Sequence, residues 1–232
     1  MTEPTPAERS AIVRDGLGVG LATGLYGVSF GAVSVAAGLS VLQTCALSLV
    51  MFTGASQFAF IGVVAAGGAP LSGAVTALLL GTRNTLYGLK LAPLLEFRGW
   101  RRAATAQLVI DESTAMSMTR ESRTAARVGF LTTGLAVFCL WNLFTFLGAI
   151  AGNLIGDPRT YGLDAAVGAA FLALLWPRLA DHRNRVIAAC SAAVALVSVP
   201  LTSAGVPVLV AGGVALLAGL LTPTAVDETE LP

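Results

Sequence analysis

The chain has 232 residues, of which 55% are apolar and only 12% charged, with a formal net charge of +1 and a mean hydropathy of +0.79. A soluble domain carries about twice that share of charge, and nucleic-acid binding needs a concentrated basic surface, so the composition excludes a soluble domain and argues against nucleic acid as a partner. We expect an integral membrane protein embedded in lipid, with room for about seven spans of roughly 20 residues each.

The chain order predicts three parts. Residues 1–15 form a polar amino-terminal segment without the charged-then-apolar order of a cleavable signal. Residues 16–222 form a single transmembrane domain, and residues 223–232 form an acidic tail. The predicted fold is all-α, a polytopic membrane helix bundle of about seven transmembrane helices. The apolar runs lie at Gly16–Leu39, Val41–Ala66, Leu71–Leu91, Val128–Ile155, Gly162–Leu179, Val186–Leu201 and Val206–Leu221.

One segment, Ala103–Met118, is ambiguous because it is moderately apolar but contains several polar and acidic residues. It is either a polar crossing buried in the bundle or a helix on the membrane surface, and we favour the surface helix. Arginines at residues 98–102 and 120–127 flank it, which predicts that this side faces the cytoplasm. Seven crossings then place the amino terminus on the opposite side, unless the first run is broken or re-entrant.

Glycines and polar residues interrupt the apolar runs in the first half of the chain, at Gly27–Gly31 and Phe52–Phe58. A bilayer crossing hides its backbone polar groups only inside a regular helix, so we predict broken or re-entrant helices here that line a path for a zwitterionic substrate. The alternatives are close helix packing by the glycines and a hydrogen bond between helices by Gln57. The predicted substrate-binding residues from these stretches are Ser29, Phe30, Gly31, Gly54, Ser56 and Gln57.

Charged residues within apolar surroundings add to this site. Arg83 lies deep in the third run beside Asn84, so we predict that these two residues bind substrate, with Arg83 either attracting a carboxylate or pairing with Asp111 or Glu112. Snorkelling of Arg83 toward the membrane surface is the structural alternative. Asp111 and Glu112 point about 100 degrees apart on a helix, so at most one faces a given site. If buried, one of them is a candidate for proton coupling; at the surface both are ordinary solvated charges.

Signals for catalysis are weak. Gly27–Gly31 matches the nucleophile-elbow pattern around Ser29, but no strand precedes it, and the single histidine, His182, lies in a charged loop. The three cysteines, Cys45, Cys139 and Cys190, have neither paired nor metal-ligand spacing. We therefore expect a protein that is not an enzyme and binds no metal.

Four motifs follow one another in this sequence, namely Tyr26-Gly-Val-Ser-Phe-Gly31, Phe52-Thr-Gly-Ala-Ser-Gln-Phe58, Arg83-Asn-Thr-Leu-Tyr-Gly88 with Pro93, and Asp111-Glu112. Their order resembles the AzlC family, the large subunit of branched-chain amino acid exporters. The resemblance is concentrated between about residues 15 and 120 and is most specific at Gly54–Gln57. It implies export of leucine, isoleucine and valine across the bacterial cell membrane, driven by an ion gradient, without a soluble cofactor and with a small membrane subunit of the AzlD type.

A second transporter class stays open on the residues alone. The chain could be the membrane subunit of an ATP-driven transporter, with the basic segment Arg98–Arg127 docking a separate ATPase. The sequence itself has no Gly-rich phosphate-binding loop with the required Lys-Ser/Thr ending. A need for ATP rather than an ion gradient distinguishes that class from a secondary transporter.

Overall fold

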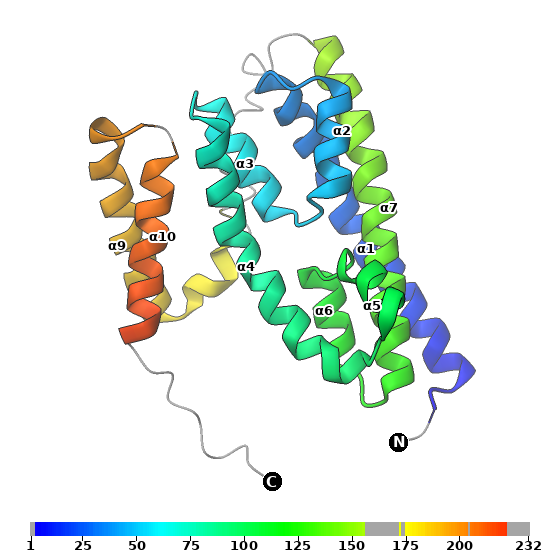
Figure 1. The fold of residues 1–232 in the computed structure, drawn as a ribbon. Helices are drawn as coiled ribbons and strands as arrows, with labels where there is room; N and C mark the ends of the chain where they lie inside the picture. Colours follow the sequence, from blue (N-terminus) through cyan, green and yellow to red (C-terminus); the bar gives the residue numbers. More distant parts are fainter. Residues whose placement is uncertain (1–2, 156–171, 173–174, 204, 222–232) are drawn as a thin grey trace.

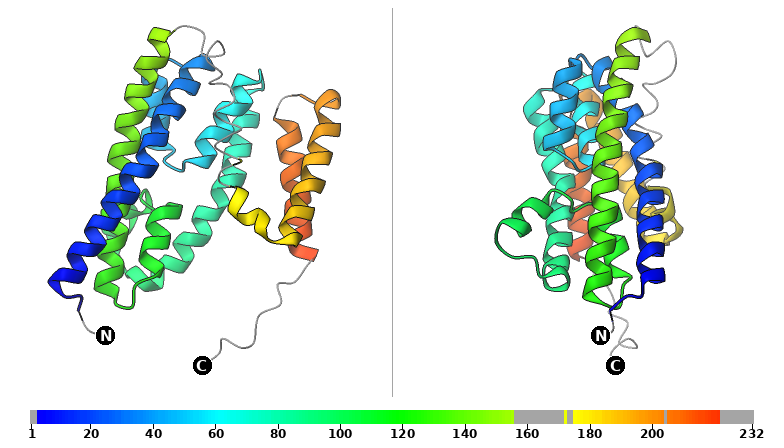
Figure 2. Two further views of the ribbon diagram at one scale, coloured as in Figure 1. Left: turned by 180° about the vertical axis from the view of Figure 1, so that it is seen from behind. Right: turned by 90° about the vertical axis from the view of Figure 1, so that its right-hand side faces the viewer.

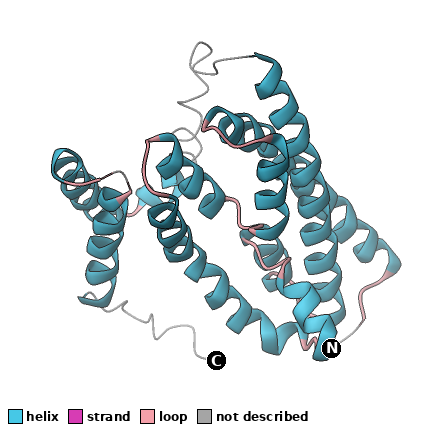
Figure 3. Ribbon diagram, turned by 45° about the horizontal axis from the view of Figure 1, so that its top comes forward, coloured by secondary structure: helices cyan, strands magenta, loops and turns pink. Residues whose placement is uncertain are grey.

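The computed structural model describes residues 3–155, 172, 175–203 and 205–221, and these residues form helices and loops without a strand (Figures 1 and 3). Three described helices are long and apolar enough to cross a membrane by length and composition, namely Pro6–Ala36, Arg123–Leu154 and His182–Leu201. The predicted all-α membrane bundle is confirmed. Most of the predicted run Gly162–Leu179 and the acidic tail lie outside the described residues.

Helices α1 (Pro6–Ala36) and α7 (Arg123–Ile155) pack side by side along their length and run in the same direction (Figure 2). Glycines set the register, because Gly16 lies against Thr133 and Gly24, two turns later, lies against Leu140. Small residues one turn apart let helix backbones approach closely in lipid, where no hydrophobic force joins helices. The glycines of the first run therefore serve helix packing.

Gly31 is one of the tightest of these contacts. A Cβ added there meets the carbonyl oxygen of Thr145 and the amide nitrogen of Ala149, neither of which moves without shifting α7. We expect Gly31→Ala to lower the free energy of unfolding by about 3 kcal/mol, the upper end of the usual range for overpacking. Gly18→Ala on the same helix is the matched control, because its Cβ meets nothing within 4 Å. Equal thermal unfolding of the two detergent-solubilised variants would contradict this contact.

Helix α1 is continuous, which corrects two expectations. The break predicted at Gly27–Gly31 is wrong, because α7 covers this face of α1 and the glycines stay helical. The predicted position of the amino terminus is also wrong. Since α1 and α7 are parallel, the amino terminus lies at the end of the bundle where α7 begins, together with the loops at residues 96–98 and 119–122 (Figure 2). We call this the arginine-rich end.

The run Val41–Ala66 does not cross the bundle. It forms α2 (Val41–Val50) and α3 (Ala55–Ala65), joined by a turn in which Gly54 has a φ of 61°. The chain enters from the end opposite the arginine-rich end, turns halfway and returns to the same end, where α4 (Pro70–Leu95) begins (Figure 1). The predicted broken or re-entrant helices in the first half are therefore confirmed, in the second run rather than the first. We call α2 and α3 the first hairpin.

The ambiguous segment Ala103–Met118 is neither a complete crossing nor a surface helix. Helices α5 (Gly99–Ala106) and α6 (Asp111–Met118) enter from the arginine-rich end and return to it, forming the second hairpin (Figure 1). Two of its buried serines tolerate burial because their hydroxyl groups donate to nearby carbonyls. Ser113 donates to the carbonyl oxygen of Leu108 at 2.5 Å, and Ser117 donates to the carbonyl oxygen of Ser113 at 2.6 Å.

The first seven helices thus contain one arrangement twice. Helix α1 is followed by a hairpin that enters from the end where α1 finishes, and α4 is followed by a hairpin that enters from the end where α4 finishes (Figure 1). Because α1 and α4 run in opposite directions, the hairpins approach each other from opposite ends, as in transporters with inverted repeats. The other described elements are η2 (Trp176–Ala180), α9 (His182–Ser198), η3 (Val199–Leu201) and α10 (Val206–Leu221). Helix α10 contacts α4, and α9 packs against α10 (Figure 1).

Candidate functional site

The tips of the two hairpins meet halfway along the bundle, at a contact whose residues are exposed in the isolated chain. The Nε2 atom of Gln107, just after α5, donates to the carbonyl oxygens of Leu49 at 2.9 Å and Val50 at 3.3 Å. These carbonyls belong to the last turn of α2, where helix geometry leaves them without intrahelical partners. The side-chain amide of one hairpin therefore satisfies the helix end of the other.

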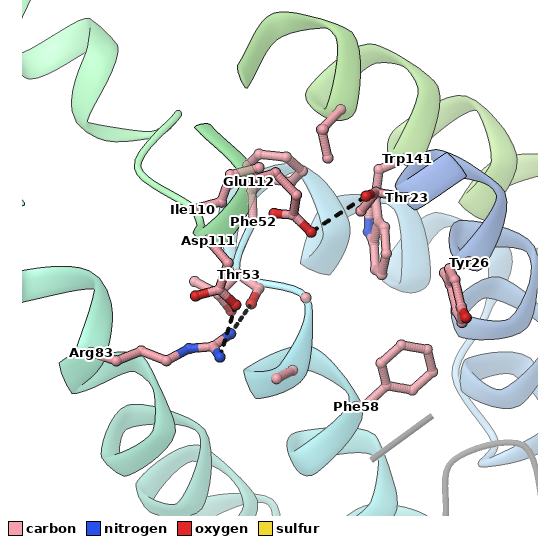
Figure 4. Close-up of a pocket in the computed structure, with 13 residues that line it drawn as sticks. Thr23, Tyr26, Phe52, Thr53, Phe58, Arg83, Ile110, Asp111, Glu112 and Trp141 are labelled. Carbon is pink, nitrogen blue, oxygen red and sulfur yellow. Dashed lines mark hydrogen bonds and ion pairs between the residues drawn. The ribbon is translucent and has the colours of Figure 1, made fainter. Parts of the chain in front are cut away.

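Arg83, near the middle of α4, joins both tips. Its Nη1 atom lies 2.9 Å from Oδ2 of Asp111 at the start of α6, and its Nη2 atom donates to the carbonyl oxygen of Thr53 at 3.5 Å (Figure 4). The next residue, Asn84, donates to the carbonyl oxygen of Val109 at 3.0 Å. Of the two acidic partners expected for Arg83, the structure selects Asp111.

A cavity of about 240 Å³, here called the central cavity, lies beside these tips (Figure 4). Drug-sized ligands occupy pockets of about 300–1,000 Å³, so this volume suits a small solute. Three of its residues, Thr23, Arg83 and Trp141, lie near the middle of α1, α4 and α7, which places the cavity halfway along the bundle. The lining residues are Thr23, Tyr26, Phe52, Thr53, Gly54, Ala55, Phe58, Arg83, Ile110, Asp111, Glu112, Val137 and Trp141.

Two half-helices begin at the central cavity, α3 at Ala55 and α6 at Asp111. The first amide groups of a helix lack intrahelical partners and carry the positive end of the helix dipole. At α6 this end is offset by the carboxylates of Asp111 and Glu112 in the first turn, whereas the first turn of α3 contains no acidic residue. The first turn of α3 therefore lacks a carboxylate of its own, although the side chain of Gln57 caps the amide of Gly54.

Asp111 and Glu112 diverge as their helical spacing predicts (Figure 4). Asp111 faces Arg83 on α4, whereas Glu112 faces α1, where the hydroxyl of Thr23 donates to its Oε1 atom at 3.4 Å. Among the residues that the structure describes, Glu112 forms no ion pair within 4.0 Å. The central cavity therefore contains one ion-paired carboxylate and one whose side-chain partner is a neutral hydroxyl.

Unpartnered polar atoms gather at the central cavity. The atoms Thr53 Oγ1, Arg83 Nε, Asp111 Oδ1 and Trp141 Nε1 are buried and have no hydrogen-bond partner among the described residues. A buried polar atom left unpaired destabilises a protein by about 1–3 kcal/mol. Their gathering at one cavity marks a place where a polar ligand or water completes the hydrogen bonds.

An aromatic wall closes the apolar side of the central cavity. Phe58 on α3 lies edge-on to Trp141 on α7, with ring centroids 6.2 Å apart. Phe30 on α1, fully buried behind them, lies 5.6 Å from Phe58 and 6.2 Å from Trp141 between ring centroids. Val137, one turn before Trp141, extends this wall. The cavity thus has a charged side at the hairpin tips and an apolar side between α3 and α7.

The predicted site residues divide into those at the central cavity and those elsewhere. Gly54, Arg83, Asp111 and Glu112 line it, whereas Ser56 and Gln57 are buried in α3 outside its lining. The Oε1 atom of Gln57 accepts a hydrogen bond from the amide of Gly54 at 3.1 Å, so this side chain caps α3 within its own hairpin.

The remaining predicted residues lie away from the central cavity. On α1, Phe30 supports the aromatic wall from behind, Gly31 packs against α7, and half-buried Ser29 is not among the lining residues. Sequence reasoning missed the lining residues Thr23 and Thr53. Their only signal is a hydroxyl group within an apolar run, which is common in membrane helices that serve packing alone.

A second cavity, of about 470 Å³, lies on the arginine-rich side of the first hairpin, and we call it the vestibule. Its lining includes Phe97 and Arg102 near the arginine-rich end and Asn84 on α4. Phe52 and Thr53 line both the vestibule and the central cavity. The tip of the first hairpin therefore separates the two cavities.

Comparisons with known proteins place this chain among membrane proteins. The model of the family described as AzlC protein matches residues 18–155, which include both hairpins and every lining residue of the central cavity. The inner membrane protein YgaZ of Escherichia coli is 27% identical over 94% of this chain and 92% of its own. An uncharacterized membrane protein of Archaeoglobus fulgidus is 30% identical over 77% of this chain and 80% of its own. An uncharacterized membrane protein of Helicobacter pylori is 24% identical over 69% of this chain and 72% of its own. No solved structure matches. The chain belongs to the AzlC family of membrane proteins.

Proposed function

We propose that this protein exports branched-chain amino acids across the bacterial cell membrane as a secondary transporter driven by an ion gradient. The observation that carries the proposal is the central cavity, where a half-helix start, an arginine and a carboxylate without an ionic partner surround a small space halfway along the bundle. Secondary transporters hold their solutes near the midplane, at discontinuous helices of this kind. Membership of the AzlC family supports the same class of function.

The chemistry of the central cavity fits an aliphatic zwitterion. The substrate carboxylate accepts hydrogen bonds at the start of α3, near Ala55, and from the unpartnered Nε1 atom of Trp141. The substrate ammonium group faces Glu112. The aliphatic side chain packs against Phe58 and Val137 on the apolar side.

The two hairpins provide a route through the membrane. By the excess of arginine, we assign the arginine-rich end to the cytoplasm, so the vestibule is the entrance for a solute that leaves the cell. The second hairpin then withdraws from the first to admit the solute, and the first hairpin opens toward the outside to release it. A small AzlD-type membrane subunit is the partner that the family resemblance implies.

Leucine flux tests the proposal. The protein, purified with its small membrane subunit, is reconstituted into liposomes loaded with labelled leucine, and efflux is measured with and without an imposed proton gradient. We expect leucine efflux that the gradient accelerates, that a protonophore slows and that needs no ATP. Efflux that needs ATP and ignores the gradient favours the ATP-driven alternative. No leucine flux under either condition contradicts the proposal.

Enlarging Val137 should change substrate selectivity. Val137→Phe fills the apolar side of the central cavity, and one extra or missing methylene in an apolar pocket already changes discrimination by roughly 10–200-fold. We therefore expect leucine transport to fall at least about tenfold while alanine transport falls less. Leu135→Phe, at a position of α7 that is 49% exposed, is the matched control and should leave both activities unchanged. Equal loss for both amino acids would contradict the assigned position of the side chain.

A further inference from the structure

We infer that Glu112 holds, in turn, the exchanged proton and the ammonium group of the amino acid, so that the two never occupy it together. This inference rests on the proposed function and assigns its coupling step to one side chain. Asp111, its neighbour in sequence, has a different role, because it balances the charge of Arg83 and joins the second hairpin to α4.

The different roles follow from the partners of the two carboxylates. Asp111 accepts a charge-assisted hydrogen bond from Arg83 at 2.9 Å. The same guanidinium group also donates to the carbonyl oxygen of Thr53 in the first hairpin. Releasing Asp111 in each transport cycle therefore means breaking the contact between the hairpins and α4. Glu112 accepts only a 3.4 Å hydrogen bond from the hydroxyl of Thr23 among the side chains at the cavity, so its charge is available.

No other ionisable group that lines this site is available for the coupling step. From α4, Arg83 faces the pair and is engaged by Asp111. From α1, Thr23 and Tyr26 line the cavity, and each contributes a hydroxyl group rather than a carboxyl or basic group. The residues that α7 and the first hairpin contribute to the cavity, from Phe52 to Phe58 and at Val137 and Trp141, carry no ionisable side chain.

A lone carboxylate halfway along a membrane bundle needs a positive partner. Charged side chains at this depth pair with one another or lie on ion and proton pathways, because leaving the charge uncompensated in a medium of low dielectric destabilises it. Here the two available partners are a proton and the substrate ammonium group. The protonated acid cannot form an ion pair, so binding of the ammonium releases the proton: COOH and RNH₃⁺ become COO⁻ paired with RNH₃⁺, plus one H⁺.

This exchange makes transport a one-for-one antiport. A proton that arrives from outside displaces the amino acid outward, and an amino acid that arrives from the cytoplasm displaces the proton inward. Because the amino acid is a neutral zwitterion, each cycle moves one positive charge into the cell. Acidification weakens leucine binding, since the proton and the ammonium group compete for the same oxygens.

Proton release on leucine binding tests the inference. Leucine is added to the purified complex in a weakly buffered detergent solution, with bound leucine measured by scintillation proximity and released protons by a pH indicator. The wild-type protein should release about one proton per bound leucine, a ratio that follows from the exchange at one carboxylate. Glu112→Gln should bind leucine more weakly, with no proton release and the same affinity at acidic and neutral pH.

Glu121→Gln, the same chemical change at an exposed loop position, is the matched control and should release protons as the wild type does. Leucine binding by the wild type without proton release overturns the inference and leaves the proposed function standing, as does unaltered release from Glu112→Gln. Failure of the wild type to bind leucine overturns both. The number of protons that the wild-type protein releases per bound leucine tests the inference even if Glu112→Gln does not fold.

Discussion

Replacing Arg83 by glutamine should destabilise the protein by about 3 kcal/mol, and adding Asp111→Asn to the same chain should restore a large part of that loss. Removing one partner of a buried ion pair leaves an uncompensated charge and destabilises by about 3–5 kcal/mol. The side chains of Arg83 and Asp111 are 29% and 35% exposed, so water in the central cavity screens the pair and the lower end applies. The double variant removes both charges together.

A double-mutant cycle on thermal unfolding in detergent measures this coupling, because contacting residues deviate from additivity. The surface pair Arg123 and Glu96, with Nη2 and Oε1 2.6 Å apart and both side chains more than a third exposed, is the control. Arg123→Gln should change the stability by less than about 1 kcal/mol. Additive effects of Arg83→Gln and Asp111→Asn would show that the two charges do not depend on each other. Transport should stay lost in the double variant, because Arg83 also holds the carbonyl of Thr53.

Linking the two hairpin tips should abolish transport. Val50 and Gln107 lie on facing tips, with Nε2 of Gln107 3.3 Å from the carbonyl oxygen of Val50, and the solute route needs these tips to separate. Val50→Cys and Gln107→Cys are introduced together in a chain whose three native cysteines are replaced by alanine. A cleavable bifunctional maleimide then joins them. We expect leucine flux to stop on linking and to return when the linker is cleaved.

Each single-cysteine variant treated with the same reagent is the control for simple modification of the tip. Measuring one protein before linking, after linking and after cleavage separates the effect of the link from the loss of the Gln107 hydrogen bonds. Undiminished flux through a fully linked protein would mean that the tips move as one body, and the route would then lie elsewhere.

Sequence pattern alone predicts the membrane bundle and part of the site. Hydropathy locates α1, α4, α7, α9 and α10, because each of these helices coincides with a long apolar run in the sequence. The depth of Arg83 in an apolar run predicts a partner, and the structure supplies Asp111. Both conclusions follow from the free energy of placing a group in lipid, which depends on the residue itself more than on its neighbours.

The backbone path could not be predicted in the same way. Gly27–Gly31 and Phe52–Phe58 show one pattern, glycine and a hydroxyl residue within an apolar run, but the first is continuous helix and the second contains a turn. The difference is tertiary, because α7 packs on the glycines of α1, whereas the second hairpin and Arg83 hold the turn near Gly54. Hydropathy also cannot distinguish a run that crosses the membrane from one that turns back halfway.

The inverted arrangement of the two hairpins has a physical reason, because the tip of each hairpin lies next to groups that can pair with its backbone. The helices of each hairpin are too short to cross the bundle, so each hairpin turns halfway along it, where the ends of its helices leave backbone groups that need partners. Gln107 satisfies the end of α2, and Asn84 satisfies the carbonyl of Val109 in the second tip. The start of α3, with no acidic residue in its first turn, remains for a solute.

The most direct test of the central cavity as the substrate site is an electron cryomicroscopy map of the complete complex saturated with leucine. The predicted result is leucine density bounded by the start of α3, Glu112 and the aromatic wall, with its carboxylate at Ala55 and its side chain toward Val137. Leucine density anywhere else, with the central cavity closed or occupied by protein side chains, would contradict the account.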